Sequence, residues 1–542
     1  MIDRRRFIGT TVIGGAGLTL AAGCGPESSE RSEQPESPQA RPFELDEVDV
    51  AELQRSMASG ERTARSITEL YLGRIEELNA QGPELRAIIE TNPDSLIIAD
   101  TLDLERAAGN IRGPLHGIPV AIKDNIDTHD RMTTTAGSLA LEGSIPEQDS
   151  FAAQQLREAG AIILAKANLS EWANFRGDPS SSGWSARGGQ CQNPYALNRS
   201  PCGSSAGSGV AASANLAALT IGTETNGSII CPSAFNGIVG IKPTVGLWSR
   251  SGIIPISHSQ DTAGPMCRTV RDAAILLGAV TGTDSRDVAT SSSQGNSHTD
   301  YTQFLNSAGL QGARIGVARN FTGFGSRVVD LFEQALDAMR AEGAIVVDPA
   351  NVEVPESNDA LAGLVMEYEF KANLNNYLSS LGSSAPVKSL AEVIAFNEQN
   401  ADREMPYFGQ ELMYQSEERG PLTDPEYLNA VRTIQQATRE DGIDRVMSEH
   451  RLDAIVAPTT GLPFPTDHIK GDPWAGMGYS ASPAAIAGYP DITVPMGFVS
   501  GLPAGVSFFA GAWSEPTLIS VAYAYEQATN HRRPPTFAET LG

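Results

Sequence analysis

An α/β fold, in which helices cover both faces of a sheet, is predicted by three features of the 542-residue sequence. Helical patterns alternate with short apolar runs along most of the chain. The stretches 149–168 and 330–347 both read as a helix, a glycine stop and an apolar strand. Hydrophobic residues make up 41% of the chain and charged residues 19%, which supplies a large core. This alternation is typical of a sheet buried on both sides.

Two helices are predicted near the start of the pattern. From about Phe43 to Leu78 the apolar residues recur mostly every three or four positions, and Gly60 interrupts them. Ser66 and Glu69 have the spacing of a capping box for part of the second helix.

The other elements are predicted from apolar runs and local composition. Small residues after position 206 favour a helix that leads into a strand, and the polar stretch 284–300 favours a surface loop. Residues 356–450 are mostly helical and polar, and we expect them to form a lobe over the sheet. Short apolar strands are predicted in 117–126, 161–165, 219–222, 344–347, 453–460 and 491–498.

The first 24 residues have the features of an export signal. The run Arg4-Arg5-Arg6-Phe7-Ile8 resembles a twin-arginine motif, and Leu20-Ala21-Ala22-Gly23-Cys24 resembles a bacterial lipobox. We therefore expect export to the bacterial cell envelope or periplasm, with a lipid at Cys24 as the link to a membrane. Residues 25–42 are rich in Pro, Ser and Glu and are predicted to be a disordered linker, which leaves 43–542 as the folded domain.

Charge and cysteine content narrow the choice of partners. A formal net charge of −26 repels phosphate backbones, so no nucleic-acid partner is expected. Four cysteines follow the signal and form no CxxC pair, and no histidine stands at ligand spacing, so no metal site is predicted. Whether they form disulfides stays open at this stage; they are Cys191, Cys202, Cys231 and Cys267.

Lys123 ends the apolar stretch GIPVAIK and is a candidate base. Desolvation at the end of a buried strand disfavours the ammonium form. A neutral amine at pH 7 requires the pKa to fall by about 3 units, which costs roughly 4–5 kcal/mol. The alternative is a lysine that extends to solvent and keeps its charge.

The stretch IGTETNGSIICPSAFNGIVGIKPT, residues 221–244, carries a candidate nucleophile. A strand is expected to end at Gly222, and Gly227 permits a tight turn beside Ser228. Consecutive amides of such a turn can stabilise an oxyanion. The alternative is an ordinary turn between two elements.

The stretch SPCGSSAGSGV, residues 200–210, fits G-x-S-x-G and would make Ser205 a nucleophile. The preceding residues do not form a buried strand, and the candidate histidines His258, His450 and His531 lack an informative context. A phosphate-binding loop would need a lysine after the glycines, which is absent from this stretch.

Together, these three stretches resemble the motifs of the amidase signature family. The family's lysine segment is similar to GPLHGIPVAIKDNI, and its serine segments are similar to CGSSAGSGVAASA and to residues 221–244. Their order and spacing agree with the family, because Ser204 follows Lys123 by 81 residues and Ser228 follows after 24 more. The resemblance covers about residue 43 to the C-terminus. Within the family the chain looks closest to the bacterial peptide amidases, through stretches such as NLSEWANFRG and SRSGIIPISHSQDTAGPM.

The resemblance implies a single α/β/α domain around a large, mixed, twisted sheet. It also implies that Ser228 is the nucleophile, that Ser204 is a bridging serine held by a cis peptide bond, and that Lys123 accepts a proton through Ser204. The backbone amides of Thr225, Asn226 and Gly227, with that of Ser228, would hold the oxyanion. Many family members have a glycine where this chain has Asn226.

We therefore expect an amidase that converts carboxamides to carboxylate and ammonia, acts as a monomer and needs no cofactor. The expected substrates are C-terminal amides of peptides or of N-acylated amino acids. One alternative is a broad-specificity amidase acting on fatty or aryl amides. A second is a non-catalytic binding lipoprotein of the envelope. A third is one component of a tRNA-dependent amidotransferase, and the export signal and the acidity disfavour that role.

Overall fold

The computed structural model describes residues 42–382, 385–473 and 480–541. The predicted export signal 1–24, with Cys24, lies outside these residues, and so does the predicted linker 25–42 except for its last residue. Within the described part of the chain, no helix is long and apolar enough to cross a bilayer.

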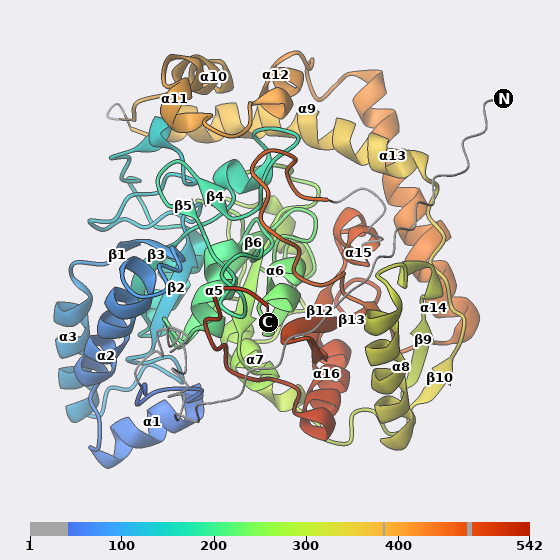
Figure 1. The fold of residues 1–542 in the computed structure, drawn as a ribbon, viewed down its shortest axis with the longest axis horizontal. Coiled ribbons are helices and arrows are strands. Elements are labelled where there is room, and N and C mark those ends of the chain that lie inside the picture. Colours follow the sequence, from blue (N-terminus) through green and yellow to red (C-terminus); the bar gives the residue numbers. More distant parts are fainter. Residues whose placement is uncertain (1–41, 383–384, 474–479, 542) are drawn as a thin grey trace, which may run out of the picture. The chain divides into compact units, whose positions relative to one another are not determined.

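An 11-stranded sheet runs through the structure, and its middle strands lie at the centre of Figure 1. The strand order is β1-β3-β2-β6-β8-β7-β12-β13-β11-β9-β10. Four neighbouring pairs are parallel, namely β2 with β3, β2 with β6, β9 with β10 and β9 with β11, and the others are antiparallel. The strands are β1 (Ile88–Thr91), β2 (Pro119–Lys123), β3 (Ile162–Ala167), β6 (Leu219–Glu224), β7 (Val239–Lys242), β8 (Thr262–Cys267), β9 (Arg314–Val317), β10 (Ile345–Val347), β11 (Ala454–Pro458), β12 (Asp491–Val499) and β13 (Leu502–Phe509).

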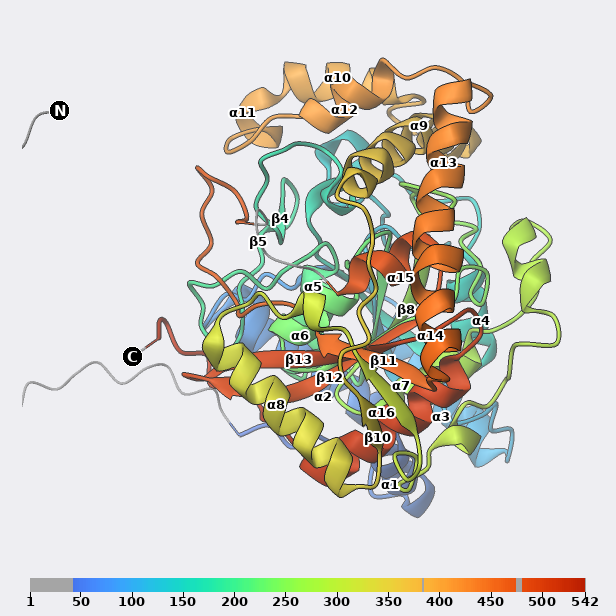
Figure 2. The same ribbon diagram turned by 90° about the vertical axis from the view of Figure 1, so that its right-hand side faces the viewer.

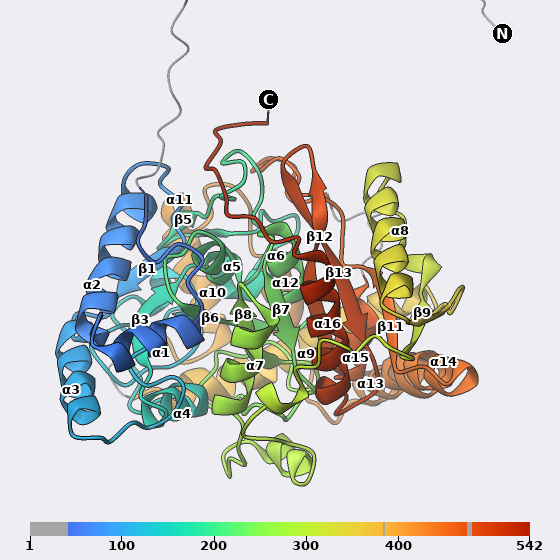
Figure 3. The same cartoon turned by 90° about the horizontal axis from the view of Figure 1, so that it is seen from below.

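Helices surround this sheet, as the view from below shows (Figure 3). A separate two-stranded sheet is formed by β4 (Trp184–Ser185) and β5 (Gly189–Gln190). The helices that precede the lobe or follow it are α1 (Val50–Ser59), α2 (Ala64–Ile75), α3 (Ser95–Ala107), α4 (Phe151–Glu158), α5 (Ala206–Ser213), α6 (Ile230–Phe235), α7 (Val270–Ala279), α8 (Ser326–Ala341), α15 (Ala481–Ala487) and α16 (Glu515–Thr529).

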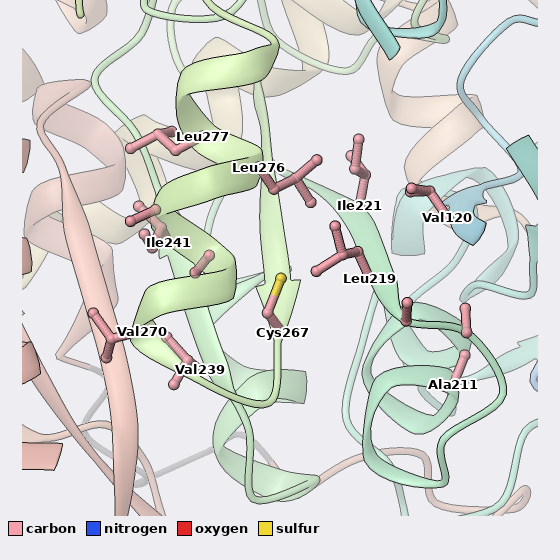
Figure 4. Packing of buried hydrophobic residues seen from close by; sticks show 14 of the residues in the cluster. Val120, Ala211, Leu219, Ile221, Val239, Ile241, Cys267, Val270, Leu276 and Leu277 are labelled. Carbon is pink, nitrogen blue, oxygen red and sulfur yellow. The ribbon is translucent and has the colours of Figure 1, made fainter. Parts of the chain in front are cut away.

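The two faces of β6 have different neighbours, and the serine-rich segment that begins α5 packs against one of them. Leu219 and Ile221 lie on the side covered by α7, where Figure 4 shows Leu276 beside them. Gly222 lies against the start of α5, because a Cβ atom there would come within 2.8 Å of Ser205 Oγ. Only a glycine lets the Ser205 segment approach the strand so closely.

A helical lobe lies over one edge of this layered core, at the top of Figures 1 and 2. Leu374 and Leu378 of its longest helix and Leu390 of the next belong to an apolar cluster that includes Leu169 and Ile254 of the main body. The lobe helices are α9 (Ser357–Ser380), α10 (Leu390–Gln399), α11 (Ala401–Glu404), α12 (Glu411–Glu417) and α13 (Pro425–Thr438), and α14 (Asp444–His450) leads back to the sheet.

The structure confirms the predicted α/β fold with a large mixed sheet, and it confirms helices through 356–450. The predicted strand 219–222 continues to Glu224, and the predicted loop 284–300 contains a short 3₁₀ helix, Val288–Ser293. The predicted capping box is wrong. Thr63 is the N-cap of α2 and exchanges hydrogen bonds with Ser66, because the helix already begins at Ala64.

Candidate active site

Lys123 lies at the end of β2 and is completely buried. Its Nζ atom is 2.7 Å from Ser204 Oγ, 2.8 Å from Thr223 Oγ1 and 3.2 Å from the Thr223 carbonyl oxygen. An ammonium has three N–H donors, and a neutral amine has two donors and one lone pair, so these three partners can satisfy either form of the side chain.

Burial lowers the pKa of Lys123 to about 7, against the opposing influence of the Asp261 and Glu224 carboxylates. Within the described part of the chain, neither carboxylate forms an ion pair with the amine. Hydroxyl and carbonyl oxygens surround it instead. The amine can thus be partly neutral at pH 7, as the sequence predicts for a proton acceptor.

Thr223 organises this cluster, although sequence reasoning does not single it out as a site residue. Its hydroxyl accepts a hydrogen bond from Asn125 Nδ2 at 3.0 Å, and its carbonyl accepts one from Ser205 Oγ at 2.9 Å. Thr223 lies one residue before the end of β6, and Asn125 lies two residues after the end of β2. Their position at the ends of these two strands is the sequence feature that could have identified them. Their hydroxyl and amide groups fix the position of the lysine amine.

The Ser204 segment is held in a specific conformation. The Gly203–Ser204 peptide bond is cis, as the family resemblance implies. The Ser204 carbonyl accepts a hydrogen bond from the Ser170 backbone N–H at 3.0 Å. A Cβ atom on Gly203 would come within 2.2 Å of Ser170 Oγ, so no larger residue fits there.

The Ser228 turn follows the end of β6. Gly227 has φ +79°, a conformation that favours glycine, and Ser228 keeps 9% of its surface exposed. The buried Glu224 carboxylate accepts hydrogen bonds from the backbone N–H groups of Ile229 at 2.7 Å and Ile230 at 3.0 Å. Burial raises the pKa of Glu224, and its backbone partners, Gly227 among them, oppose that rise. Glu224 therefore ties the turn to the strand.

This contact bears on the predicted oxyanion hole. The backbone N–H of Gly227 faces Glu224, whereas the side chains of Thr225 and Asn226 bond elsewhere. Thr225 Oγ1 donates to Asp261 at 2.5 Å, and Asn226 Nδ2 donates to Ser482 Oγ at 3.2 Å. Both side-chain bonds leave the backbone amides of Thr225 and Asn226 as candidate donors.

Two links join the Ser204 segment to the Ser228 turn. The Ser205 backbone N–H donates to the Ser228 carbonyl at 3.2 Å. A disulfide connects Cys202 to Cys231, with 6.0 Å between their Cα atoms, and settles a question that the sequence leaves open. Cys191 and Cys267 are free and buried. Among the described residues, no direct hydrogen bond joins the Ser228 hydroxyl to Ser204 or Lys123.

A cavity of about 850 Å³ opens at the Ser228 turn. Gly203, Asn226 and Ser228 line it on the sheet side, and Met366 of α9 lines it on the lobe side. A volume of this size holds a molecule of the size of a dipeptide or a drug. Ser228 is thus the candidate nucleophile that a substrate can reach.

Ser205 has no such access. It is fully buried, its hydroxyl donates to the Thr223 carbonyl, and its oxygen accepts from the Thr223 backbone N–H at 3.1 Å. These bonds occupy the hydroxyl, so Ser205 braces the loop against β6 and the G-x-S-x-G interpretation finds no support.

Comparisons with known proteins agree with the fold and the motifs. Residues 66–519 match the family model described as Amidase. The crystal structure of native peptide amidase from Stenotrophomonas maltophilia is 50% identical, with a TM-score of 0.87, and the match covers 92% of this chain and 100% of that one. The crystal structure of an amidase family protein from Bacillus anthracis is 37% identical, with a TM-score of 0.82, over 91% of this chain and 93% of that one. A protein of Arabidopsis thaliana named "Probable amidase" is 42% identical over 91% of this chain and 92% of its own length.

The fold, the buried lysine and the two serine segments, together with these matches, define a class of amide hydrolases. The chain belongs to the amidase signature family and is an amide-hydrolysing enzyme.

Proposed function

We propose that this enzyme removes the C-terminal amide from peptides or N-acylated amino acids and releases ammonia. Ser228 is the nucleophile, Ser204 relays protons and Lys123 accepts them. The observation that carries the proposal is the 2.7 Å contact between Lys123 Nζ and Ser204 Oγ inside a buried cluster whose amine has a pKa of about 7.

The first half of the reaction forms an acyl-enzyme. Ser204 donates its proton to the neutral amine of Lys123 and takes one from Ser228, whose oxygen attacks the carboxamide carbon. The backbone amides of Thr225, Asn226 and Ser228 stabilise the oxyanion, whereas the N–H of Gly227 faces Glu224 in this structure. The proton then returns from Lys123 through Ser204 to the leaving nitrogen, and ammonia departs.

The second half reverses the proton path. Water donates a proton to Ser204 while it attacks the acyl carbon, and Ser204 passes its own proton to Lys123. Collapse of the tetrahedral intermediate breaks the bond to Ser228, whose oxygen recovers a proton through Ser204. The products are the carboxylate and the restored enzyme.

The preference for peptide amides is supported by the cavity and by the relative. The cavity beside Ser228 combines apolar side chains with three amides and two carboxylates, those of Glu356 and Asp359, and the described residues that line it include no Lys, Arg or His. A cavity lining without cations suits an uncharged carboxamide end better than a free carboxylate. The native peptide amidase, at 50% identity, shares the whole fold.

A substrate panel tests the proposal. Ammonia release is measured for an amidated N-acetyl dipeptide, a fatty primary amide and an aryl carboxamide, with parent enzyme and with Ser228→Ala. The proposal predicts that the dipeptide amide has the highest kcat/KM and that Ser228→Ala is inactive on every substrate. Inert peptide amides with fast fatty or aryl amides would favour the broad-specificity alternative instead.

We further propose that the enzyme is exported, works as a monomer and is anchored to the cell envelope by a lipid on Cys24. The support is the order of the two N-terminal signals, which the sequence places before the folded domain. Expression of the parent and of Cys24→Ala, followed by membrane fractionation, tests the anchor. The parent should sediment with membranes and the variant should not, whereas equal sedimentation would remove the anchor from the proposal.

A further inference from the structure

Asp261 makes a hydrogen bond to the catalytic turn from a neighbouring loop. One carboxylate oxygen accepts a bond from Thr225 Oγ1 at 2.5 Å. The other accepts bonds from the backbone N–H groups of Ile256 and Ser257, both at 2.8 Å. Residues 256–261, here called the Asp261 loop, are thereby closed on themselves and tied to the first residue of the turn that ends in Ser228.

Glu369 of α9 holds the same loop from the helical lobe. It is completely buried, and one oxygen accepts bonds from Ser257 Oγ at 2.6 Å and from Ser259 Oγ at 3.0 Å and Ser259 N at 3.1 Å. Its other oxygen accepts a bond from Tyr427 Oη of α13 at 2.7 Å and lies 3.5 Å from Nε2 of His258, a residue of the same loop. A buried carboxylate with this many donors is well satisfied and rigid.

The carboxylates of Glu369 and Asp261 connect the helical lobe to the Ser228 turn through a chain of hydrogen bonds. α13 and α9 hold the Asp261 loop through Glu369, and that loop holds Thr225 through Asp261. Met366 of α9, one helical turn before Glu369, lines the cavity that contains Ser228. The same helix therefore contacts the substrate cavity and supports the turn that carries the nucleophile.

We propose that Asp261 is a positioning residue for amide hydrolysis, which holds Thr225 and with it the Ser228 turn, and that Glu369 keeps the Asp261 loop in place from the lobe. The inference rests on the proposed function, because it concerns the geometry of that reaction. Loss of the Asp261 contact loosens the backbone amides of the turn, and misplaced oxyanion donors lower kcat more than they raise KM.

Charge gives this role a signature that a merely structural residue lacks. Asp261 and Glu224 are the carboxylates that favour the ammonium form of Lys123. Burial raises the pKa of Asp261 to about 6, opposed by the hydrogen bonds from Thr225, Ile256 and Ser257 and by the charge of Arg250. Arg250 itself is paired with Asp287 at 2.5 Å. Removing the Asp261 charge lowers the pKa of Lys123 and moves the acid limb of kcat/KM to lower pH.

Asp261→Asn is the main test, with an amidated N-acetyl dipeptide as substrate. We expect kcat to fall by about 10- to 100-fold, the loss of one charge-assisted hydrogen bond, while KM changes by less than about threefold. We also expect the acid limb to move to lower pH. A kcat within twofold of the parent, or an acid limb at the parent's position, overturns the proposal.

Thr225 and Glu369 supply the matched variants, which leave the Asp261 charge in place. Thr225→Val lacks the hydroxyl and should lose about tenfold or more in kcat with an unmoved acid limb, whereas Thr225→Ser keeps the bond and should retain at least fivefold more activity than Thr225→Val. Glu369→Gln should lower kcat by about three- to tenfold. Equal kcat values for the two Thr225 variants would contradict the role of the Thr225–Asp261 bond. A parental kcat for Glu369→Gln would contradict the role of Glu369.

Ser228→Ala separates this inference from the function on which it rests. If that variant still releases ammonia at the parent's rate, the proposed function fails whatever Asp261→Asn does. If it is inactive while Asp261→Asn behaves as the parent, only the positioning role fails.

Discussion

Three buried lysines lie in this one sheet, and they differ in what surrounds the amine. The chain has six lysines, and Lys123, Lys166 and Lys242 are completely buried, on β2, β3 and β7. Lys166 pairs in register with Ile122, the neighbour of Lys123, so the two side chains point to opposite faces of the sheet. Burial at a strand end is therefore not what distinguishes the candidate base.

The partners of each amine make the difference. Lys166 Nζ donates to the Ile126 carbonyl at 2.6 Å and to Thr134 Oγ1 at 2.8 Å, and burial lowers its pKa against the Asp124 and Asp127 carboxylates. Lys242 likewise has its pKa lowered by burial, against three carboxylates, those of Glu224, Asp491 and Glu515.

Lys123 contacts two hydroxyls, and one of them, that of Ser204, is on a loop that lies beside a substrate-sized cavity. Nearby carboxylates favour the ammonium form of all three lysines, so the distinguishing feature of Lys123 is the serine hydroxyl beside the cavity, which can exchange protons with a neutral amine. We therefore expect Lys123, and not Lys166 or Lys242, to act as the base.

Lys123→Met should have the largest effect on activity. It keeps the length of the side chain in an apolar position and removes the proton acceptor, so kcat should fall by about 10³-fold or more. Ammonia release from an amidated dipeptide measures the loss, and thermal unfolding shows whether the fold is retained. Activity within tenfold of the parent would exclude Lys123 as the base.

Lys166→Met is the matched control on the neighbouring strand. It leaves the Ile126 carbonyl and the Thr134 hydroxyl without their buried donor, which should destabilise the protein by about 1–3 kcal/mol. The kcat of the folded fraction should stay within about threefold of the parent, because Lys166 faces away from the serines. A loss as large as that of Lys123→Met would erase the distinction between the two lysines.

The Cys202–Cys231 disulfide tests whether the serine loops must be fastened to each other. It spans 29 residues, for which chain entropy predicts about 3–4 kcal/mol of stabilisation. Replacing both cysteines with alanine should lower the unfolding midpoint and reduce kcat, since Ser204 lies two residues after Cys202. Cys267→Ala, at a free buried cysteine, is the control and should leave kcat unchanged.

The pH dependence of kcat/KM for the parent enzyme should show the titration of the proton acceptor, Lys123. Because Lys123 must be neutral to take a proton and its pKa is about 7, kcat/KM should rise roughly tenfold per pH unit below 7 and level off above it. A tenfold change per pH unit corresponds to about 1.4 kcal/mol of activation free energy. A profile that is flat from pH 5 to 8 would contradict the assignment.

The sequence predicts the chemistry better than it predicts the supports of the site. The resemblance to the amidase signature family implies that Lys123 and Ser204 share one site, and the structure brings them into contact. Thr223 and Asp261 are missed, because a hydroxyl or carboxylate that acts through a neighbour has no spacing pattern of its own. The disulfide also escapes prediction, since residues 202 and 231 meet only through the fold.

Several strands escape prediction for a related reason. β8 reads Thr-Ala-Gly-Pro-Met-Cys, which is neither alternating nor rich in β-branched residues. Its Gly264 lies where a Cβ atom would come within 2.1 Å of the Ile241 carbonyl of β7. Tight packing between neighbouring backbones selects small residues there, and tertiary contact of that kind has no signature in the sequence.

Direct titration of the lysine amines tests whether Lys123 is neutral often enough near pH 7 to accept a proton. With only six lysines in the chain, ¹³Cε-lysine labelling gives a resolvable set of signals, and Lys123→Met identifies the one that belongs to position 123. This signal should titrate near pH 7 in the free enzyme. A titration above pH 9 would mean that the amine is charged at neutral pH and cannot be the proton acceptor.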